Sequence, residues 1–181
     1  MSYAVIGGLA VSVRSEPRVT RDADLAVAVA SDREAEALVR ELIGRGYRIL
    51  AQLEQDDTHR LATVRLVSPN RPDANSFVVD LMFASCGIET EVVRDASTAE
   101  VFPGVSLPVA TRAHLIAMKV LSTGPKRFQD RGDLHALIQR ASEAEIGSAR
   151  AAVATIHQRH SARTKDLVAD LERILKEEGR S

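Results

Sequence analysis

The chain has 181 residues, of which 45% are hydrophobic and 27% charged, as is typical of one globular domain, alone or with a small appendage. Its formal net charge is −1, which excludes binding to nucleic acid through overall charge, and its single cysteine excludes a disulfide within the chain. No apolar stretch is long enough to span a membrane and the N-terminus lacks a signal-peptide pattern, so we expect a cytoplasmic protein without membrane contacts.

The first half of the chain predicts a mixed sheet. Strands are expected over residues 3–6, 22–30, 47–53, 61–67 and 77–83. A brief helix is expected over residues 9–13. Ser31 and Glu34 form the Ser-x-x-Glu pattern of a capping box, so a longer helix should begin there and end at Gly44 and Gly46.

The second half is mainly helical. Prolines and a glycine interrupt residues 101–109, which should therefore form an edge strand pair or a turn and not a central strand. Thr111 is placed to cap a helix that Gly124 ends, and Ser142 opens a second capping box. Helices are expected over residues 87–96, 112–123, 129–140 and 143–178, the last with a break near 159–163.

These elements predict an α+β fold. The sheet should be small and mixed, with about five strands, flanking helices and a helical C-terminal half. Residues 1–110 should form the core that holds the sheet, and residues 111–181 should form a helical region packed on that core.

Three aspartates are candidate metal ligands. Leu25, Val27 and Val29 would share one face of their strand, which leaves Asp22 and Asp24 together on the other face, about 7 Å apart along the backbone. An Asp-x-Asp pair alone is more often a solvated strand edge or turn. Asp80, however, is the single charge in the apolar strand FVVDLMF, where a carboxylate is costly unless it is paired or binds a metal. We therefore favour a Mg²⁺ site at these three residues.

Two further groups of residues are candidates for binding phosphate. The Gly7-Gly8 pair is by itself typical of a turn, but the free amides of a helix that begins there would bind an anion. Lys119 lies in an otherwise apolar helix and is either a surface lysine or a point charge for a triphosphate. Arg127 follows Gly124-Pro125 and is either part of a solvated turn or a second phosphate contact.

In this order, the glycine pair, the Asp-x-Asp and the later lone aspartate resemble the nucleotidyltransferase superfamily with the polymerase-β-type fold. Residues 18–24, RVTRDAD, are similar to the R-x-T-[KR]-D-x-D form of the AbiEii toxin branch. Residues 115–134 resemble the same branch, because a helix with a central lysine is followed by a basic turn and then by Asp130 and Asp133. The resemblance covers residues 3–137.

The resemblance implies an enzyme that transfers a nucleoside monophosphate from an NTP to an acceptor hydroxyl. The catalytic residues would be Asp22, Asp24, Asp80, Lys119 and Asp133, with Asp130 as a further candidate. Two Mg²⁺ or Mn²⁺ ions would lie between Asp22, Asp24 and Asp80. The nucleotide would be held by Gly7, Gly8, Ser12, Lys119 and Arg127.

The resemblance also implies a toxin of a bacterial toxin–antitoxin or phage-defence system, with a cognate antitoxin as partner. The acceptor would be the 3′ end of tRNA or a protein hydroxyl. Two alternatives stay open: an enzyme that modifies a small molecule, as antibiotic-modifying relatives do, and a nucleotide-binding regulatory module without turnover. Labelling of RNA or protein by the purified protein with Mg²⁺ and NTP would distinguish these functions.

Overall fold

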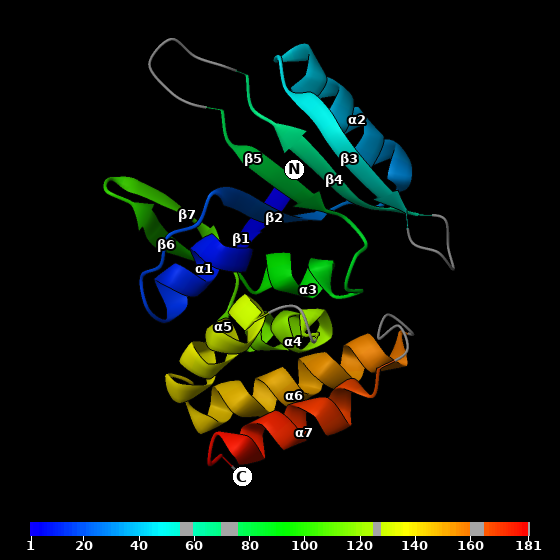
Figure 1. Cartoon of the computed structure of the whole chain (residues 1–181). Helices are drawn as coiled ribbons and strands as arrows, with labels where there is room; N and C mark the ends of the chain where they lie inside the picture. Colours follow the sequence, from blue (N-terminus) through cyan, green and yellow to red (C-terminus); the bar gives the residue numbers. More distant parts are fainter. Residues whose placement is uncertain (55–59, 70–75, 125–127, 160–164, 181) are drawn as a thin grey trace.

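The computed structural model describes residues 1–54, 60–69, 76–124, 128–159 and 165–180. Within them, seven strands form one mixed sheet in the order β3-β4-β5-β2-β1-β7-β6 (Figure 1). The strands are β1 Ser2–Ile6, β2 Asp22–Ala28, β3 Arg48–Glu54, β4 Leu61–Val67, β5 Val78–Met82, β6 Ser97–Phe102 and β7 Val105–Val109. The helices are α1 Gly7–Arg14, α2 Asp32–Gly44, α3 Glu89–Arg94, α4 Arg112–Ser122, α5 Phe128–Gln139, α6 Glu143–Gln158 and α7 Leu167–Glu177. The predicted α+β class is confirmed.

The sheet has seven strands where about five were predicted, because residues 97–109 form the edge strand pair that was one of two alternatives for residues 101–109. β6 and β7 are an antiparallel hairpin that turns at Pro103 and Gly104, where Gly104 has a φ of 75°. β7 joins the sheet by pairing in parallel with β1, with Val5 opposite Val109. The hairpin lies at the edge of the sheet, as the prolines indicated, but it extends the sheet instead of forming a separate turn.

The pairing of the central strands fixes which charged residues lie side by side. β2 runs parallel to β5 with Asp24 opposite Asp80, and β4 runs antiparallel to β5 with Arg65 opposite Asp80. β1 runs antiparallel to β2 and ends with Ile6 opposite Asp24. Three charged side chains on neighbouring strands therefore form one row across the sheet, next to the start of α1.

Helix caps confirm the helix starts expected after Ser31, Thr111 and Ser142. Each of these side chains accepts a hydrogen bond from the backbone N–H three residues later. At Ser142 both arms of the capping box are present. Each cap satisfies a backbone N–H that has no partner inside the helix, which fixes the residue at which the helix begins.

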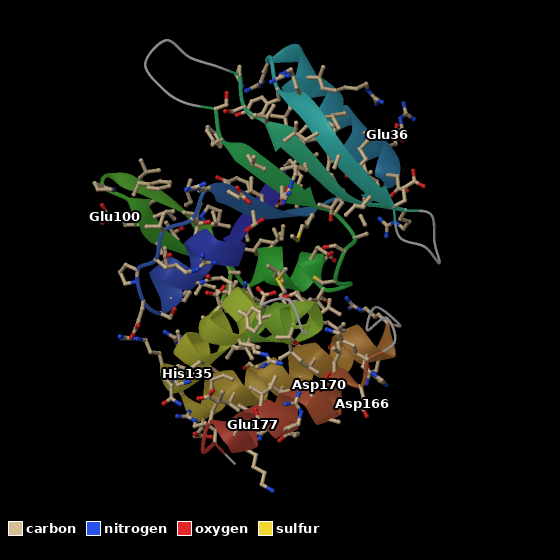
Figure 2. All side chains as sticks on the ribbon, viewed as in Figure 1. Glu36, Glu100, His135, Asp166, Asp170 and Glu177 are labelled. Atoms are coloured by element: carbon tan, nitrogen blue, oxygen red, sulfur yellow. The ribbon has the colours of Figure 1, made fainter. Side chains whose placement is uncertain are left out.

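Two hydrophobic cores lie on the two sides of the sheet. The smaller core packs Ala35 and Val39 of α2 against the sheet, and the larger joins β1 to α1 and to α3–α7. Residues on both sides of the predicted boundary at 110 and 111 share the larger core. Charged side chains such as Glu36 and Asp170 project from the outer surface (Figure 2). Among the described residues, no helix is long and apolar enough to cross a membrane.

Candidate functional site

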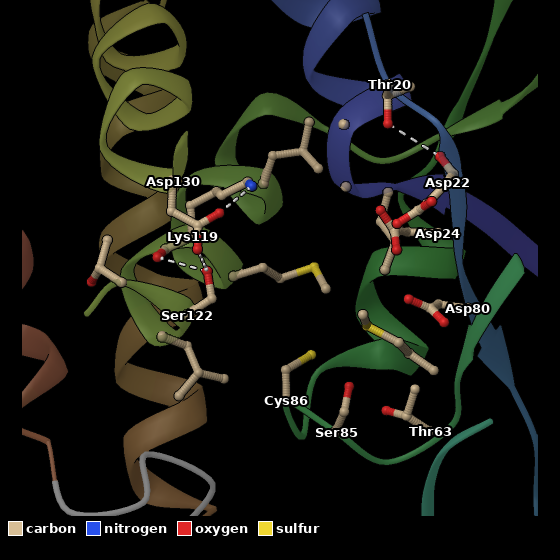
Figure 3. A pocket seen from close by; sticks show the side chains of 18 of the residues that line it. Thr20, Asp22, Asp24, Thr63, Asp80, Ser85, Cys86, Lys119, Ser122 and Asp130 are labelled. Carbon is tan, nitrogen blue, oxygen red and sulfur yellow. Dashed lines mark hydrogen bonds and ion pairs between the residues drawn. The ribbon is translucent and has the colours of Figure 1, made fainter. Parts of the chain in front are cut away.

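A cavity of about 850 Å³ separates the sheet from the helices that follow residue 111 (Figure 3). Its sheet wall carries Asp22, Asp24 and Asp80, and its helical wall carries Lys119, Ser122 and Asp130. A cavity of this volume accommodates a ligand the size of a nucleotide. The structure therefore brings the predicted acidic residues and the predicted lysine to opposite walls of one cavity.

The three carboxylates of the sheet wall share one face. Asp22 and Asp24 are next-but-one residues of β2, and Asp80 lies on the neighbouring strand directly opposite Asp24. Burial, the charge of Asp80 and the charge of Asp22 raise the pKa of Asp24 to about 6, although a hydrogen bond from the Gly8 N–H opposes the rise. The surroundings of Asp24 thus disfavour its ionised form, which is the behaviour expected of a carboxylate in a cation-binding site.

Asp80 is paired with Arg65 in this structure. The Arg65 Nε and Nη2 atoms donate to Asp80 Oδ1 and Oδ2 at 2.8 and 2.6 Å, and only 8% of the Asp80 side chain is exposed. The ion pair, with Asp22 and Asp24 nearby, raises the pKa of Arg65. The charge that Asp80 places in an apolar strand is therefore balanced by a cation on the next strand.

Gly7 is required where α1 begins. It has a φ of 59°, and a Cβ atom at this position would lie 1.8 Å from Asp24 Oδ2. Gly8 also lies close to the loop before β2, since a Cβ atom there would lie 2.6 Å from Arg18 Nη2. The two glycines therefore let the start of the helix approach Asp24, and both line the cavity.

Ser12 is engaged away from the cavity. Its hydroxyl lies 3.0 Å from the Gly8 carbonyl oxygen and 3.1 Å from the Arg18 carbonyl oxygen, and the Arg18 N–H donates to it. Ser12 does not line the cavity, so it holds the loop in place in this structure. The predicted nucleotide contact Arg127 lies outside the described residues.

On the helical wall, Lys119 lies in a network of buried charges. Its Nζ lies 2.6 Å from Asp130 Oδ1 and 2.7 Å from Asp133 Oδ2. Asp133, 2% exposed, also pairs with Arg18 of the loop before β2 at 3.0 Å. Only 13% of the Lys119 side chain is exposed, which excludes the surface lysine that was one alternative. Asp133 lies behind Lys119 and Arg18 and does not itself line the cavity.

Three cations of the cavity were missed in the sequence. Arg65 could have been found, since it is the single charge in the apolar strand LATVRLV, and two lone charges on neighbouring strands predict a pair. Arg18 is part of the RVTRDAD motif, but only the folded chain places it against Asp133. Lys165 donates to the carbonyl oxygens of Leu121 and Thr123 at the end of α4, and no local pattern indicates that contact.

The donor chemistry fits a hard divalent cation, with one qualification set by Asp80. Among the described residues, no three His, Cys, Asp or Glu side chains converge closely enough to hold a metal ion. Mg²⁺ needs only one or two protein carboxylates, because waters and substrate phosphates supply its other ligands. Asp22 and Asp24 supply such a pair on one strand face, whereas both oxygens of Asp80 are engaged by Arg65.

Comparison with known proteins gives a family match over almost the whole chain. Residues 2–180 match the family model described as "Nucleotidyl transferase AbiEii toxin, Type IV TA system". Comparison with curated protein sequences gives no match.

Two solved structures are similar to this chain in fold but share little sequence identity with it. JHP933 from Helicobacter pylori is similar over 99% of this chain and 86% of its own, with 12% identity and a TM-score of 0.45. A second H. pylori protein, assigned as a nucleotidyltransferase, is similar over 99% of this chain and 88% of its own, with 12% identity and a TM-score of 0.44.

Proposed function

The chain belongs to the AbiEii family of nucleotidyl transferase toxins of type IV toxin–antitoxin systems, and from this premise we propose that it transfers a nucleoside monophosphate from an NTP to an acceptor hydroxyl. The proposal rests on one observation: the acidic wall and the wall that carries Lys119 face each other across one cavity. Asp22, Asp24 and Asp80 face Lys119 across a space that accommodates a nucleotide. Family membership also implies a cognate antitoxin.

Asp22, Asp24 and Asp80 would hold two Mg²⁺ or Mn²⁺ ions. Bound there, the ions would neutralise the triphosphate and lower the pKa of the acceptor hydroxyl. The charges of the cavity support a role for metal ions. Its lining carries four carboxylates and four cationic side chains, which nearly cancel. Three of those cations, Arg18, Arg65 and Lys119, are already paired with aspartates, so the protein alone offers little net positive charge to a polyphosphate.

The remaining residues would position the two substrates. Lys119 and Arg18, both held by Asp133, would contact the triphosphate as fixed cations. The start of α1 at Gly7 and Gly8 would approach the phosphates through its backbone amides. Asp80 would lie on the acceptor side, with Arg65 fixing its orientation. Catalysis would then consist mainly of positioning and charge neutralisation.

The acceptor we propose is the 3′ end of tRNA or a protein hydroxyl. The experiment is labelling of a cell lysate by the purified protein with Mg²⁺ and each radiolabelled NTP in turn. We expect one class of macromolecule to be labelled by the wild type and not by the Asp22→Asn, Asp24→Asn double variant. Equal labelling by the double variant would contradict the proposal, and transfer to small molecules alone would favour the antibiotic-type alternative.

A further inference from the structure

The cavity has a charged end and an uncharged end. Figure 3 shows Thr20 at one end, and Gly8 and Arg18 lie next to Thr20. At the other end the labelled side chains are small and carry no acidic or basic group; they are Thr63, Ser85 and Cys86. An NTP is divided in the same way, because its triphosphate is charged and its base is not. With the phosphates near Arg18 and the aspartates of β2, the base would lie at the uncharged end.

Two methionines line the cavity, one on each wall. Met82 comes two residues after Asp80, on the same face of β5, and lies opposite Thr63 of β4 at the uncharged end. Met118 directly precedes Lys119 on α4. Both methionine side chains are partly buried. Because thioether sulfurs make favourable contacts with aromatic rings, each wall offers an apolar contact that suits a nucleobase.

The uncharged end is more enclosed than the rim that β3 forms. Cys86 exposes only 3% of its surface, whereas Leu53, which also lines the cavity, exposes 63%. Leu53 lies on the edge strand of the sheet, where a macromolecule can approach from solvent. The acceptor would therefore enter along β3, and the base of the NTP would occupy the enclosed end.

Ser85 presents a hydrogen-bond acceptor to this enclosed end. Its hydroxyl donates to Glu89 Oε1 at 3.2 Å, and the same oxygen accepts the N–H groups of Ser85 and Cys86 at 2.5 and 2.6 Å. Glu89 is buried, so these bonds fix the loop between β5 and α3. A serine hydroxyl has one proton and two lone pairs. With its proton directed at Glu89, the Ser85 oxygen can only accept from a ligand.

Thr63 lies close to this loop and is free to bond in either direction. The N–H groups of Phe83 and Ala84 both donate to the Ala62 carbonyl oxygen, which holds the start of the loop against β4. Within the part of the chain that the structure describes, the Thr63 hydroxyl makes no hydrogen bond. It can therefore donate to a ligand or accept from one.

We propose that Ser85 selects NTPs whose base carries an amino group beside an unprotonated ring nitrogen, which are ATP and CTP. The amino group would donate to Ser85 Oγ, and the Thr63 hydroxyl would donate to the ring nitrogen. Guanine and uracil carry a carbonyl in place of that amino group, and its oxygen would face the lone pairs of Ser85. A site built to accept a hydrogen bond rejects a ligand that cannot donate one. The inference rests on the proposed function and names the substrates of the same site.

Equilibrium dialysis of the full chain with Mg²⁺ and each radiolabelled NTP tests the inference without the acceptor. We expect ATP and CTP to bind about tenfold more tightly than GTP and UTP. ITP is the matched ligand, because it differs from ATP in carrying a carbonyl in place of the amino group. It should bind as weakly as GTP. This comparison uses the wild type alone and so does not depend on the folding of a variant.

Two variants assign the preference to one side chain. Ser85→Ala should weaken ATP and CTP about tenfold and leave GTP and UTP unchanged, so that the preference disappears. Glu89 keeps both backbone N–H donors in this variant, so the loop should stay in place. Thr63→Val should weaken all four NTPs to a similar extent, because its hydroxyl can serve either kind of base. Ser148→Ala, at an exposed serine of α6 outside this cavity, is the control and should change nothing.

The outcomes separate this inference from the proposed function. Equal binding of the four NTPs, a preference for GTP or UTP, or tight binding of ITP would overturn the inference while leaving an NTP-binding enzyme. A preference that persists in folded Ser85→Ala, with folding verified by circular dichroism, would do the same. If no NTP binds in the presence of Mg²⁺, the proposed transfer reaction is contradicted as well.

Discussion

Ionisation of Asp24 in the candidate site lowers the stability of the folded chain. Its pKa of about 6 in the folded chain lies above the value of about 4 in an unfolded chain. The folded chain therefore binds this proton more tightly, and the free energy of unfolding falls as the pH rises from about 4 to 6. Above pH 6 the loss reaches roughly 3 kcal/mol in metal-free protein. The ionised Asp24 carboxylate, beside Asp22 and Asp80, thus destabilises the protein when no cation balances its charge.

Asp24→Asn should consequently stabilise the metal-free protein at pH 7.5 by up to about 3 kcal/mol, because the amide carries no charge and still accepts from Gly8. At pH 3.5 to 4 the two proteins should differ little, since Asp24 is then protonated. Urea unfolding with EDTA at both pH values measures this. Glu36→Gln, at an exposed carboxylate of α2, is the control and should change stability by less than about 0.5 kcal/mol. A gain that is equal at both pH values would contradict the prediction.

Arg65 should stabilise the folded chain mainly by balancing the charge of Asp80, which is buried beside Asp24. Arg65→Gln leaves that carboxylate unpaired and should lower the free energy of unfolding by about 2 kcal/mol at pH 7.5. The Arg65→Gln, Asp80→Asn double variant should recover most of that loss, since the uncompensated charge is gone. A double-mutant cycle, measured by urea unfolding in EDTA, gives the interaction free energy between Arg65 and Asp80. Purely additive effects would show that the ion pair contributes nothing.

Lys119 combines a structural and a proposed catalytic role, which two substitutions separate. Lys119→Ala leaves Asp130 and Asp133 without their shared cation and should lower the free energy of unfolding by about 3 kcal/mol. Lys119→Arg keeps a charge there and should recover most of that stability. Transfer should fall about 10²- to 10³-fold in the alanine variant. It should stay impaired in the arginine variant, because a planar fork does not replace a compact ammonium. Full turnover by folded Lys119→Ala would remove Lys119 from the proposed site.

At the scale of single elements, the junction of β1 and α1 tolerates little change. Gly7→Ala would place a methyl group on Asp24 Oδ2 and force a residue with a side chain into a positive φ. We expect the free energy of unfolding to fall by more than about 2 kcal/mol. Gly8→Ala is the comparison, because its Cβ atom would meet only the side-chain ends of Arg18 and Thr20, which can move. Thermal melts of both variants test this, and a smaller loss for Gly7→Ala than for Gly8→Ala would refute it.

Elements with local signals could be predicted from the sequence, whereas those fixed by distant partners could not. α2, α4 and α6 carry their own N-caps, so their first residues follow from neighbouring residue types. The β6–β7 hairpin lacks strong alternation, and its place in the sheet depends on the pairing of Val5 with Val109.

The same distinction applies to the site. Asp80 is recognisable as a lone charge in an apolar strand, but the burial of Lys119 depends on α5 packing against α4. Asp133 was assigned by resemblance, and only the folded chain shows that it supports two cations instead of lining the cavity. Whether each of these residues acts in catalysis stays a prediction.

At the scale of the whole molecule, a ligand in the cavity would contact both the sheet and the helices. Mg²⁺ or Mn²⁺ with a non-hydrolysable NTP should therefore raise the melting temperature. At ligand concentrations of about 100 times Kd, the stabilisation is about 2.7 kcal/mol, which corresponds to roughly 5 to 10 °C for a chain of this size. The Asp22→Asn, Asp24→Asn double variant should show no shift. A shift that survives in the double variant would place the nucleotide elsewhere.

The order in which the chain is synthesised has a consequence for the proposed activity. The cavity is lined by residues from Ile6 to Lys165, and β1, which precedes the other strands in the chain, lies inside the sheet between β2 and β7. A nascent chain that has emerged only to residue 110 contains the acidic wall but neither Lys119 nor the helices that carry the opposite wall. The cavity is complete only once Lys165 has been added, so chains that end before α4 should lack the proposed transfer activity.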